Sequence, residues 1–353
     1  MGATITHIDI YYFSGTGNAL SVANWIRQVA EERQIKVNLY DISKLNSRTG
    51  IEVTPNSLIG IISPTHGFNF PPVMFHFLLR FPKAKMNNIF IINTRAGMKM
   101  GKLFLPGLSG MAQYFSALLL RLKGYKVAGM FPVDLPSNWI SIHPGLKSRV
   151  IESIFQKRKE QTKKFANEII NGQSNFRALY DIIQDLLITP VAILYYLVGR
   201  FVLAKTFYAS QKCNNCNLCV RECPVKAIKL IDNRPYWTFR CESCMHCMNH
   251  CPQRAIETAH GYIFSLFLIV DFLFVKWTYQ LFEINEHIDQ FPLILEKTLS
   301  TIIFTVILIV LLPFTYRILH YLLKFKSVEK LMIYSSFTSY QFWRRYKPGK
   351  KLK

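Results

Sequence analysis

The first 170 or so residues alternate short apolar runs with amphipathic segments. Apolar runs of strand length occur at residues 5–13, 37–42, 58–63, 89–93 and 127–133. Between and after them, apolar residues at helical spacing predict helices at 19–32, 72–81, 108–123 and 146–171. Strands that alternate with helices are typical of a parallel sheet covered on both faces. We therefore expect a doubly wound α/β domain over residues 1–172.

The last of these helices contains a run of basic residues. Lys157, Arg158 and Lys159 follow one another, whereas Ile154 and Phe165 lie at positions expected to face the sheet. A helix on the surface of a domain places its charged residues opposite its apolar stripe. The pattern predicts that the basic run forms a solvated face.

Three longer apolar stretches follow the α/β region. Residues 186–204 are interrupted by Pro190, residues 262–275 contain Asp271, and residues 299–316 have no charged residue over 18 positions. Eighteen apolar residues are near the lower limit for a membrane-spanning helix. We expect 186–204 to be a re-entrant or packed helix pair broken at Pro190, because a single full crossing would separate the segments on either side of it.

The two later stretches predict a membrane hairpin, 262 to about 282 and then 299–316. Acidic residues lie between them, and basic residues follow, so a hairpin keeps the basic end on the inner side. Asp271 and Lys276 would then have to be accommodated, and we expect them to pair on one helix face. The alternative is a soluble protein that uses these helices to cover its own cores.

The distribution of charge along the chain also favours association with a membrane. Lys and Arg number 43 against 21 Asp and Glu, and ten of these cations lie between Arg317 and Lys353 beside the single acid Glu329. Because this basic segment directly follows the most apolar stretch, it favours an anionic membrane surface over nucleic acid. We expect no nucleic-acid partner.

All eight cysteines fall in two runs of identical spacing. Each run is C-x2-C-x2-C-x3-C followed by proline, and the residues are Cys213, Cys216, Cys219, Cys223 and Cys241, Cys244, Cys247, Cys251. No cysteine remains for a structural disulfide, which favours a reducing, cytoplasmic compartment. A pair of zinc sites is the alternative, but zinc hooks of the C-x2-4-C type need neither the third cysteine nor the repeated proline.

This spacing resembles bacterial ferredoxins that hold two [4Fe–4S] clusters. In that family the fourth cysteine of each run binds the other cluster. The resemblance implies one ligand set of Cys213, Cys216, Cys219 and Cys251, and another of Cys241, Cys244, Cys247 and Cys223. Residues 205–260 form the expected ferredoxin-like domain.

A glycine-containing turn, residues 13–18, lies between the first strand and the first helix. Backbone N–H groups and the positive end of a helix meet at such a turn, so phosphate is its natural ligand. A Walker loop would require a lysine, which this turn lacks, and Leu20 stands where the third small residue of a dinucleotide fingerprint belongs. With Asp41 as a ribose-binding acid, the dinucleotide reading stays open, as does a tight turn without a ligand.

The turn resembles the phosphate loop of flavodoxins, with loops after the third and fourth strands in the places where that family encloses FMN. The resemblance implies that FMN is bound by three groups of residues: Ser14, Gly15, Thr16, Gly17 and Asn18; Pro64, Thr65, His66 and Gly67; and Asn93, Thr94, Arg95, Ala96 and Gly97. His66 and Phe68 are the aromatic candidates for stacking on the flavin, and His66 could equally be an ordinary loop histidine.

Together the modules resemble the fused flavodoxin/ferredoxin family. The expected organisation is a flavodoxin-like domain at 1–172, a hydrophobic helical linker at 173–204, the ferredoxin-like domain at 205–260, hydrophobic helices at 261–325 and a basic tail at 326–353. The resemblance implies electron transfer, which we expect to run between two [4Fe–4S] clusters and FMN. The apolar stretches and the basic segment predict that it takes place at the inner face of the cell membrane. A ferredoxin-like protein or a quinone is the expected partner. The alternatives are an FMN-dependent reductase of a small acceptor and a redox sensor or assembly subunit without flavin.

Overall fold

The computed structural model describes the chain apart from residues 1–4, 46–50, 52, 85–86, 282–292 and 344–353. The described residues form two compact units. The first consists of the chain up to Tyr196 together with the short segment Cys244–Asn249, and the second consists of Leu197–Ser243 and His250–Trp343.

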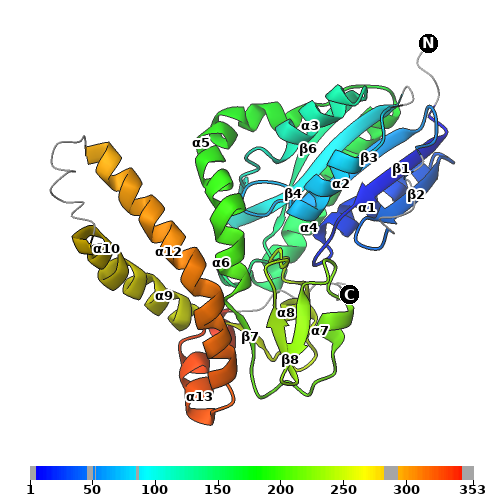
Figure 1. Ribbon diagram of the computed structural model, residues 1–353. Coiled ribbons are helices and arrows are strands. Elements are labelled where there is room, and N and C mark those ends of the chain that lie inside the picture. Colours follow the sequence, from blue (N-terminus) through cyan, green and yellow to red (C-terminus); the bar gives the residue numbers. More distant parts are fainter. Residues whose placement is uncertain (1–4, 46–50, 52, 85–86, 282–292, 344–353) are drawn as a thin grey trace. The chain divides into compact units, whose positions relative to one another are not determined.

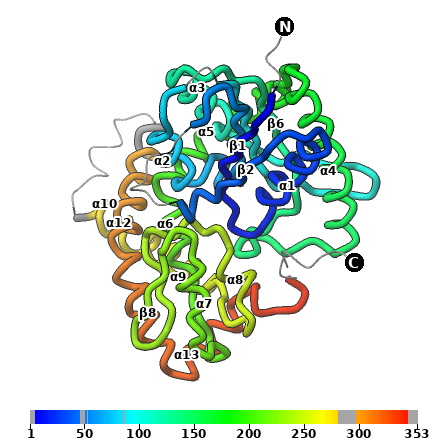
Figure 2. Tube along the Cα trace, turned by 90° about the vertical axis from the view of Figure 1, so that its right-hand side faces the viewer, coloured from blue at the N-terminus to red at the C-terminus, as the bar shows by residue number. Residues whose placement is uncertain are grey.

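A parallel sheet is the centre of the first unit (Figure 1). Its strands are β1 (His7–Tyr12), β2 (Lys36–Asp41), β3 (Leu58–Pro64), β4 (Asn88–Met100) and β6 (Lys126–Pro136), in the order β2-β1-β3-β4-β6. β1 and β2 run side by side at one edge (Figure 2). The five predicted strands are all present, and the doubly wound fold is confirmed. The short β5 (Leu103–Leu105), antiparallel to the end of β4, was not predicted.

Helices cover both faces of the sheet because side chains alternate along each strand. Ile10, Ile62 and Ile92 face the helices α1 (Asn18–Glu31) and α4 (Ser148–Ile170). The intervening residues Ile61 and Ile91 face the other core, which contains α2 (Pro72–Arg80) and α3 (Ala112–Leu122). Near-continuous apolar strands are the consequence of burial on both faces.

The basic run on α4 is not entirely solvated. Arg158 is buried, and its guanidinium lies 3.0 Å from the Asp134 carboxylate on β6. Arg158 is four residues after Ile154 and seven before Phe165, both fully buried, so it shares their helix face. The expectation that Arg158 faces water is therefore wrong.

The segment expected to break at Pro190 is continuously helical. It comprises the 3-10 turn Arg177–Asp181, α5 (Ile182–Leu194), a π-helical stretch Tyr195–Gly199 and α6 (Arg200–Ala204). Pro190 lies inside α5, and the Thr189 hydroxyl donates to the carbonyl of Asp185 at 2.8 Å, which satisfies one carbonyl near the proline. The irregularity comes at the π-helical stretch instead, so the predicted break was misplaced.

The first unit also extends beyond the predicted boundary at 172. Ala178, Asp185 and Ala192, spaced by seven residues, are the buried positions of the 3-10 turn and of α5. Asp185 accepts hydrogen bonds from the backbone N–H groups of Ser109 and Gly110 at 3.0 and 2.8 Å. A narrow stripe thus packs on the α/β unit, and the rest of α5 exposes apolar side chains such as Ile183 and Leu187.

The second unit is built from two small antiparallel ribbons and several helices. β7 (Phe207–Ala209) pairs with β10 (Ile256–Thr258), and β8 (Ile228–Ile231) pairs with β9 (Arg234–Trp237). The short helix α7 (Leu218–Arg221) lies within the first cysteine run. The helix α8 (His246–His250) lies within the second run, and all of it but His250 belongs to the first unit.

Two long helical arms of the second unit run side by side (Figures 1 and 2). One consists of α9 (His260–Ile269), a π-helical stretch Val270–Val275 and α10 (Lys276–Leu281), and the other is α12 (Leu293–Leu322). Leu266 and Val270 pack against Leu308 and Leu312 in the seam. Within the described chain Asp271 and Lys276 form no ion pair, and the Lys276 ammonium lies 4.3 Å from the ring centre of Phe272 instead.

Residues 326–343 do not form a separate basic tail. They fold into α13 (Lys326–Tyr334) and two short 3-10 turns within the second unit. Met332 packs in a cluster with Tyr208 and Leu323, and the Thr338 hydroxyl donates to Glu257 at 2.6 Å. Apolar residues at helical spacing pack this basic segment against the rest of the unit. The count of charges alone did not predict this packing. The rest of the predicted tail lies outside the described residues.

Candidate functional site

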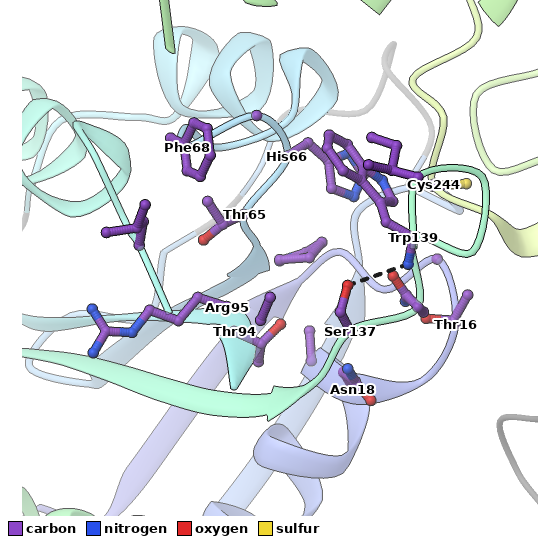
Figure 3. A pocket seen from close by; sticks show the side chains of 18 of the residues that line it. Thr16, Asn18, Thr65, His66, Phe68, Thr94, Arg95, Ser137, Trp139 and Cys244 are labelled. Carbon is purple, nitrogen blue, oxygen red and sulfur yellow. Dashed lines mark hydrogen bonds between the residues drawn. The ribbon is translucent and has the colours of Figure 1, made fainter. Parts of the chain in front are cut away.

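A cavity of about 420 Å³ opens at the carboxyl ends of the parallel strands in the first unit (Figure 3). Ligands bind at this edge of doubly wound sheets because several strand ends and loops meet there. The walls come from the loops after β1, β3 and β6, from the second half of β4, and from α5. Residues 93–97, expected to form a loop after the fourth strand, lie inside β4, because this strand continues to Met100 in pairing with β6. The lining residues are Ser14, Gly15, Thr16, Asn18, Ala19, Pro64, Thr65, His66, Gly67, Phe68, Thr94, Arg95, Ala96, Leu108, Pro136, Ser137, Asn138, Trp139, Ile142, His143, Val191, Tyr195 and Cys244.

Most of the residues expected to hold a flavin line this cavity. Three do not: Gly17, Asn93 and Gly97. Asn93 is buried, and its amide donates to the hydroxyls of Thr65 and Ser109 at 2.8 and 3.0 Å, so it supports the loops behind the wall. These three residues contribute to the frame of the site and not to its surface.

The turn after β1 is arranged to hold an anion. The Ser14 hydroxyl accepts the N–H groups of Gly17 and Leu20 at 3.1 and 3.3 Å, and its own hydrogen can still be donated. Thr16 Oγ1 is buried and has no hydrogen-bond partner among the described residues. A buried hydroxyl without a partner is costly, and a bound acceptor such as phosphate would satisfy it. The Asn18 amide donates to the carbonyl of Pro136 at 2.9 Å and so ties this turn to the end of β6.

Aromatic rings form another wall of the cavity. The centre of the Trp139 ring lies 5.9 Å from that of His66 and 5.4 Å from that of Tyr195 (Figure 3). Gly67, with a φ of +53°, lies so close that an added Cβ would meet the Tyr195 ring at 1.9 Å. Only glycine fits this loop at that position. Flat rings around an apolar cavity suit a planar, aromatic ligand.

A buried ionic network surrounds Arg95 in the second half of β4. Arg95 Nε lies 2.6 Å from Asp134 Oδ1, and Arg95 Nη1 lies 2.7 Å from Asp181 Oδ2. Asp134 also accepts the N–H of Gly107 at 2.8 Å and pairs with Arg158. The carboxylates raise the pKa of Arg95 against the opposing effect of burial. The Arg95 side chain points away from Thr16 and Trp139 (Figure 3), so its guanidinium serves the frame of the site.

The two cysteine runs share a backbone conformation. Positive φ angles occur at Asn215, Asn217 and Lys226 of the first run and, 28 residues later, at Ser243, Met245 and Arg254 of the second. In matching positions, Ala227 N–H and Ala255 N–H donate to the sulfurs of Cys223 and Cys251 at 3.2 and 3.4 Å. Backbone N–H groups directed at cysteine sulfur stabilise its negative charge. The repeat in sequence is therefore a repeat in conformation.

Thiols from the two runs lie near one another. Burial, together with charges at Cys213, Cys251 and Cys216, raises the pKa of Cys219 to about 11. Burial likewise raises the pKa of Cys241 to about 12, opposed by the N–H of Ser243 and reinforced by Cys223. Cys251 of the second run thus influences Cys219 of the first, and Cys223 of the first run influences Cys241 of the second.

The cysteines are free thiols and form no disulfide. Among the described residues no three His, Cys, Asp or Glu side chains converge closely enough for a single metal ion. A structural zinc site gathers its four ligands around one ion at roughly 2.0–2.3 Å. A cluster distributes its cysteines over several iron atoms and so suits a wider arrangement.

Two cysteines of the second run, Cys244 and Cys247, belong to the first unit, and Cys244 lines its cavity. An added Cβ at Gly15 would meet the Cys244 carbonyl oxygen at 2.6 Å, and His246 Nδ1 lies 2.6 Å from the carbonyl oxygen of Gly15. The sulfur of Cys244 is visible beside Trp139 (Figure 3). Gly15 thus permits a close approach between the anion-binding turn and a cysteine of the second run.

Several lining residues were missed in the sequence. The loop Pro136–Trp139 follows the fifth parallel strand, and the rule that ligands bind at strand ends would have identified it. Val191 and Tyr195 come from α5, and Cys244 comes from the second cysteine run. These three reach the cavity through tertiary packing, for which the sequence gives no local signal.

Comparison with protein families identifies the cysteine-rich part of the chain. Residues 212–256 match the family model described as a 4Fe-4S dicluster domain. The chain therefore joins an N-terminal flavodoxin-like fold, defined by its strand order, to a 4Fe-4S dicluster domain. This agrees with the expected flavodoxin/ferredoxin fusion. No curated protein matches the chain.

Solved structures resemble the N-terminal part only distantly. Flavodoxin 1 from Bacillus cereus is 16% identical over 44% of this chain and 97% of that protein, with a TM-score of 0.30. The rubredoxin oxygen:oxidoreductase of Desulfovibrio gigas is 15% identical over 46% of this chain, with a TM-score of 0.28, and the match spans only 36% of that enzyme. Megasphaera elsdenii flavodoxin is 17% identical over 43% of this chain and 98% of its own, with a TM-score of 0.26. The fold assignment rests on strand order and not on these values.

Removing one charge from the buried network should destabilise the first unit. We expect Arg95→Met to lower the free energy of unfolding by about 3 kcal/mol, because it leaves Asp134 and Asp181 buried with fewer partners. Urea denaturation of the full-length protein followed by circular dichroism measures the change. As a control, Lys163→Met breaks the more exposed pair with Glu32 and should cost less than about 1 kcal/mol. Equal effects of the two substitutions would contradict the role given to the network.

Proposed function

We propose that this protein is an electron-transfer iron–sulfur flavoprotein in which two [4Fe–4S] clusters exchange electrons with FMN. The observation that carries the proposal is the presence, in one chain, of a strand-end cavity with an anion-binding turn and of a duplicated eight-cysteine module. A flavin accepts one or two electrons and a cluster transfers one at a time, so the pair links two-electron reactions to one-electron carriers. The reaction requires no nucleophile or acid–base pair from the protein.

The cavity residues fit FMN. Its volume of about 420 Å³ is within the range of small-molecule sites. The hydroxyls of Ser14 and Thr16 would bind the phosphate, and Trp139 is the ring best placed to stack on the flavin. His66 and Tyr195, in contact with Trp139, would hold that ring in place. The chain's own contribution is to bind and orient the cofactor and to exclude water from its ring.

The cysteine module fits two cubane clusters. We assign Cys213, Cys216, Cys219 and Cys251 to one cluster, and Cys241, Cys244, Cys247 and Cys223 to the other. The electrostatic coupling of Cys219 to Cys251 and of Cys241 to Cys223 supports the crossed sets. Cys244 lines the flavin cavity, which supports the second cluster as the one that exchanges electrons with the flavin.

Membrane association completes the proposal. Three helical segments of the described chain are long and apolar enough to cross a membrane: Arg177–Ala204, His260–Gln280 and Lys297–Leu322. Along α12, residues at intervals of four, from Ile302 to Ile318, are 43–66% exposed, whereas the opposite face forms the seam with α9. A helix apolar on both faces suits lipid outside and protein inside. Its 30 residues give a length of about 45 Å, enough to span the hydrocarbon core.

We infer that the hairpin of α9–α10 and α12 anchors the protein at the inner face of the cell membrane. The α5 segment, which packs on the α/β unit through Asp185, would lie at the membrane surface and not cross it alone. A membrane-dissolved quinone or a ferredoxin-like protein is the proposed redox partner. The exposed apolar faces favour the quinone, because it would reach the protein from the lipid.

The crossed ligand sets predict which pairs of cysteine substitutions act together. Cys219→Ser with Cys251→Ser removes two ligands of one cluster, so one cluster should survive. Cys219→Ser with Cys223→Ser removes a ligand from each, so both clusters should be lost or altered. Iron analysis and EPR of the reduced, anaerobically purified protein distinguish the outcomes. If the two double variants gave the same spectra, the crossed assignment would be wrong.

The phosphate role of Thr16 predicts selectivity between flavins. Thr16→Val should weaken FMN binding about 10- to 100-fold, the value of one hydrogen bond to a charged group. Binding of riboflavin, which lacks the phosphate, should be unchanged. Quenching of flavin fluorescence by flavin-depleted protein gives both affinities. Thr162→Val, which removes a buried hydroxyl bonded to Arg158 in α4, is the control. An equal loss for both flavins would contradict the assignment.

The lipid-facing stripe predicts how the protein partitions. The full-length chain should remain with membranes after a high-salt wash and be released by detergent. Val306→Asp with Val310→Asp should move it to the soluble fraction, since each aspartate near a helix centre costs about 3 kcal/mol. Leu122→Asp, at an exposed leucine of α3, should leave the distribution unchanged. A wild-type chain that is soluble without detergent would exclude the hairpin anchor.

A further inference from the structure

The second unit contains a buried lysine whose charge is not neutralised by an acid. Lys205 follows α6 and is only 2% exposed. Within the described chain it forms no ion pair with a carboxylate. An isolated buried ammonium is costly unless its surroundings favour positive charge. Packing alone does not explain why a lysine occupies this buried position.

The surroundings of Lys205 favour a cation. Its Nζ donates to the carbonyl oxygen of Trp237 at 2.6 Å and lies 4.5, 4.5 and 4.6 Å from the ring centres of Tyr236, Phe239 and Tyr316. Aromatic faces attract cations through their quadrupoles, most strongly where water is absent. Three rings and a carbonyl stabilise the positive charge, but none of them cancels it.

This cation lies beside the start of the second cysteine run. Trp237 and Phe239 precede Cys241 by four and two residues, and Cys241 N–H donates to the carbonyl of Thr238 at 3.1 Å. Burial lowers the pKa of Lys205 to about 8, and negative charge at Cys241 opposes that decrease. The lysine therefore carries a positive charge at neutral pH.

The matching position of the first run has the opposite charge. The two runs are offset by 28 residues, so Gln211 corresponds to Phe239. The Gln211 N–H donates to the Glu329 carboxylate, which is 4% exposed. Glu329 also makes no ion pair within the described chain. A buried carboxylate thus approaches the first run where a buried ammonium approaches the second.

We propose that Lys205 and Glu329 set the two clusters to different reduction potentials, with the cluster bound through Cys241 the higher. The inference rests on the proposed clusters. Net charge near a cluster is one of the determinants of its potential. Reduction of a cluster by a one-electron carrier adds one electron and one negative charge, and no bond forms and no proton moves. The ammonium stabilises that added charge, and the carboxylate opposes it at the other cluster.

The difference in potential determines which of the two clusters holds the electrons. Electrons on the module reside preferentially on the cluster whose ligand set includes Cys244, which lines the flavin cavity. Lys205 and Glu329 bind no iron in this scheme. Both are positioning charges that act on the clusters through space.

EPR-monitored redox titration of the full-length, anaerobically purified protein tests the proposal. The wild type should show two midpoint potentials, and loss of the higher one in Cys241→Ser assigns it to the second cluster. Lys205→Met should lower the reduced-to-oxidised ratio of that cluster at least tenfold at its wild-type midpoint, a shift of about 59 mV for one electron. Glu329→Gln should raise the ratio of the other cluster.

Matched variants separate charge from packing. Lys205→Gln can still donate to Trp237 and has no charge, so it should shift the same midpoint, and it also serves if the methionine variant does not fold. Lys212→Met, at an exposed lysine next to Cys213, should change either ratio less than threefold because water screens it. Unchanged midpoints in Lys205→Gln and Glu329→Gln with intact clusters would overturn the inference alone. Absence of iron from the wild type would instead refute the proposed function.

Discussion

The candidate flavin site depends on the hydrogen bonds and ion pairs of one carboxylate, that of Asp134. This carboxylate lies near the end of β6 and binds Arg95 in the second half of β4, Arg158 on α4 and the N–H of Gly107 in the loop that follows β5. Strand ends in a parallel sheet leave their loops without a pairing partner, so something else must hold them. Here charged hydrogen bonds with little exposure to water hold these loops, and the loops in turn form the walls of the cavity.

The cysteine module is governed by a different constraint. In the proposed scheme, each run supplies its fourth cysteine to the other cluster, as in the ferredoxins that the spacing resembles. Positive φ angles at matched positions of the two runs form the turns around the sulfurs. The duplicated backbone nevertheless has unlike surroundings, because Lys205 is buried beside one run and Glu329 beside the other. A symmetric scaffold with asymmetric charges suits a module that moves electrons in one direction.

Most of the fold was predictable from periodicity. The five parallel strands and their four helices alternate regularly and agree with the sequence pattern to within a few residues, except that β4 continues to Met100, seven residues past the predicted end. The prediction that Arg158 faces water is wrong because adjacent residues of a helix point to different faces. Its spacing from Ile154 and Phe165 places it on the buried face. The break expected at Pro190 is wrong because a proline removes only one backbone hydrogen bond, and α5 continues on both sides of it.

The site was predictable only in part. The turn containing Thr16 and the loop containing His66 carry local signals, whereas Tyr195 reaches the cavity from a helix far along the chain. Lys205 has no distinguishing feature in the sequence, because its role depends on rings from β9 and α12 that fold around it. Charge alone predicts a tail at residues 326–343. Apolar contacts such as that of Met332 instead pack these residues within the second unit.

Electron transfer within one molecule is the central claim, and rapid mixing tests it most directly. A reduced one-electron donor is mixed anaerobically with the oxidised full-length protein, and flavin absorbance and the EPR of the frozen clusters are followed together. The account predicts that the clusters are reduced first and that the flavin follows at a rate independent of protein concentration. A flavin that stays oxidised, or whose reduction accelerates in proportion to protein concentration, would contradict it.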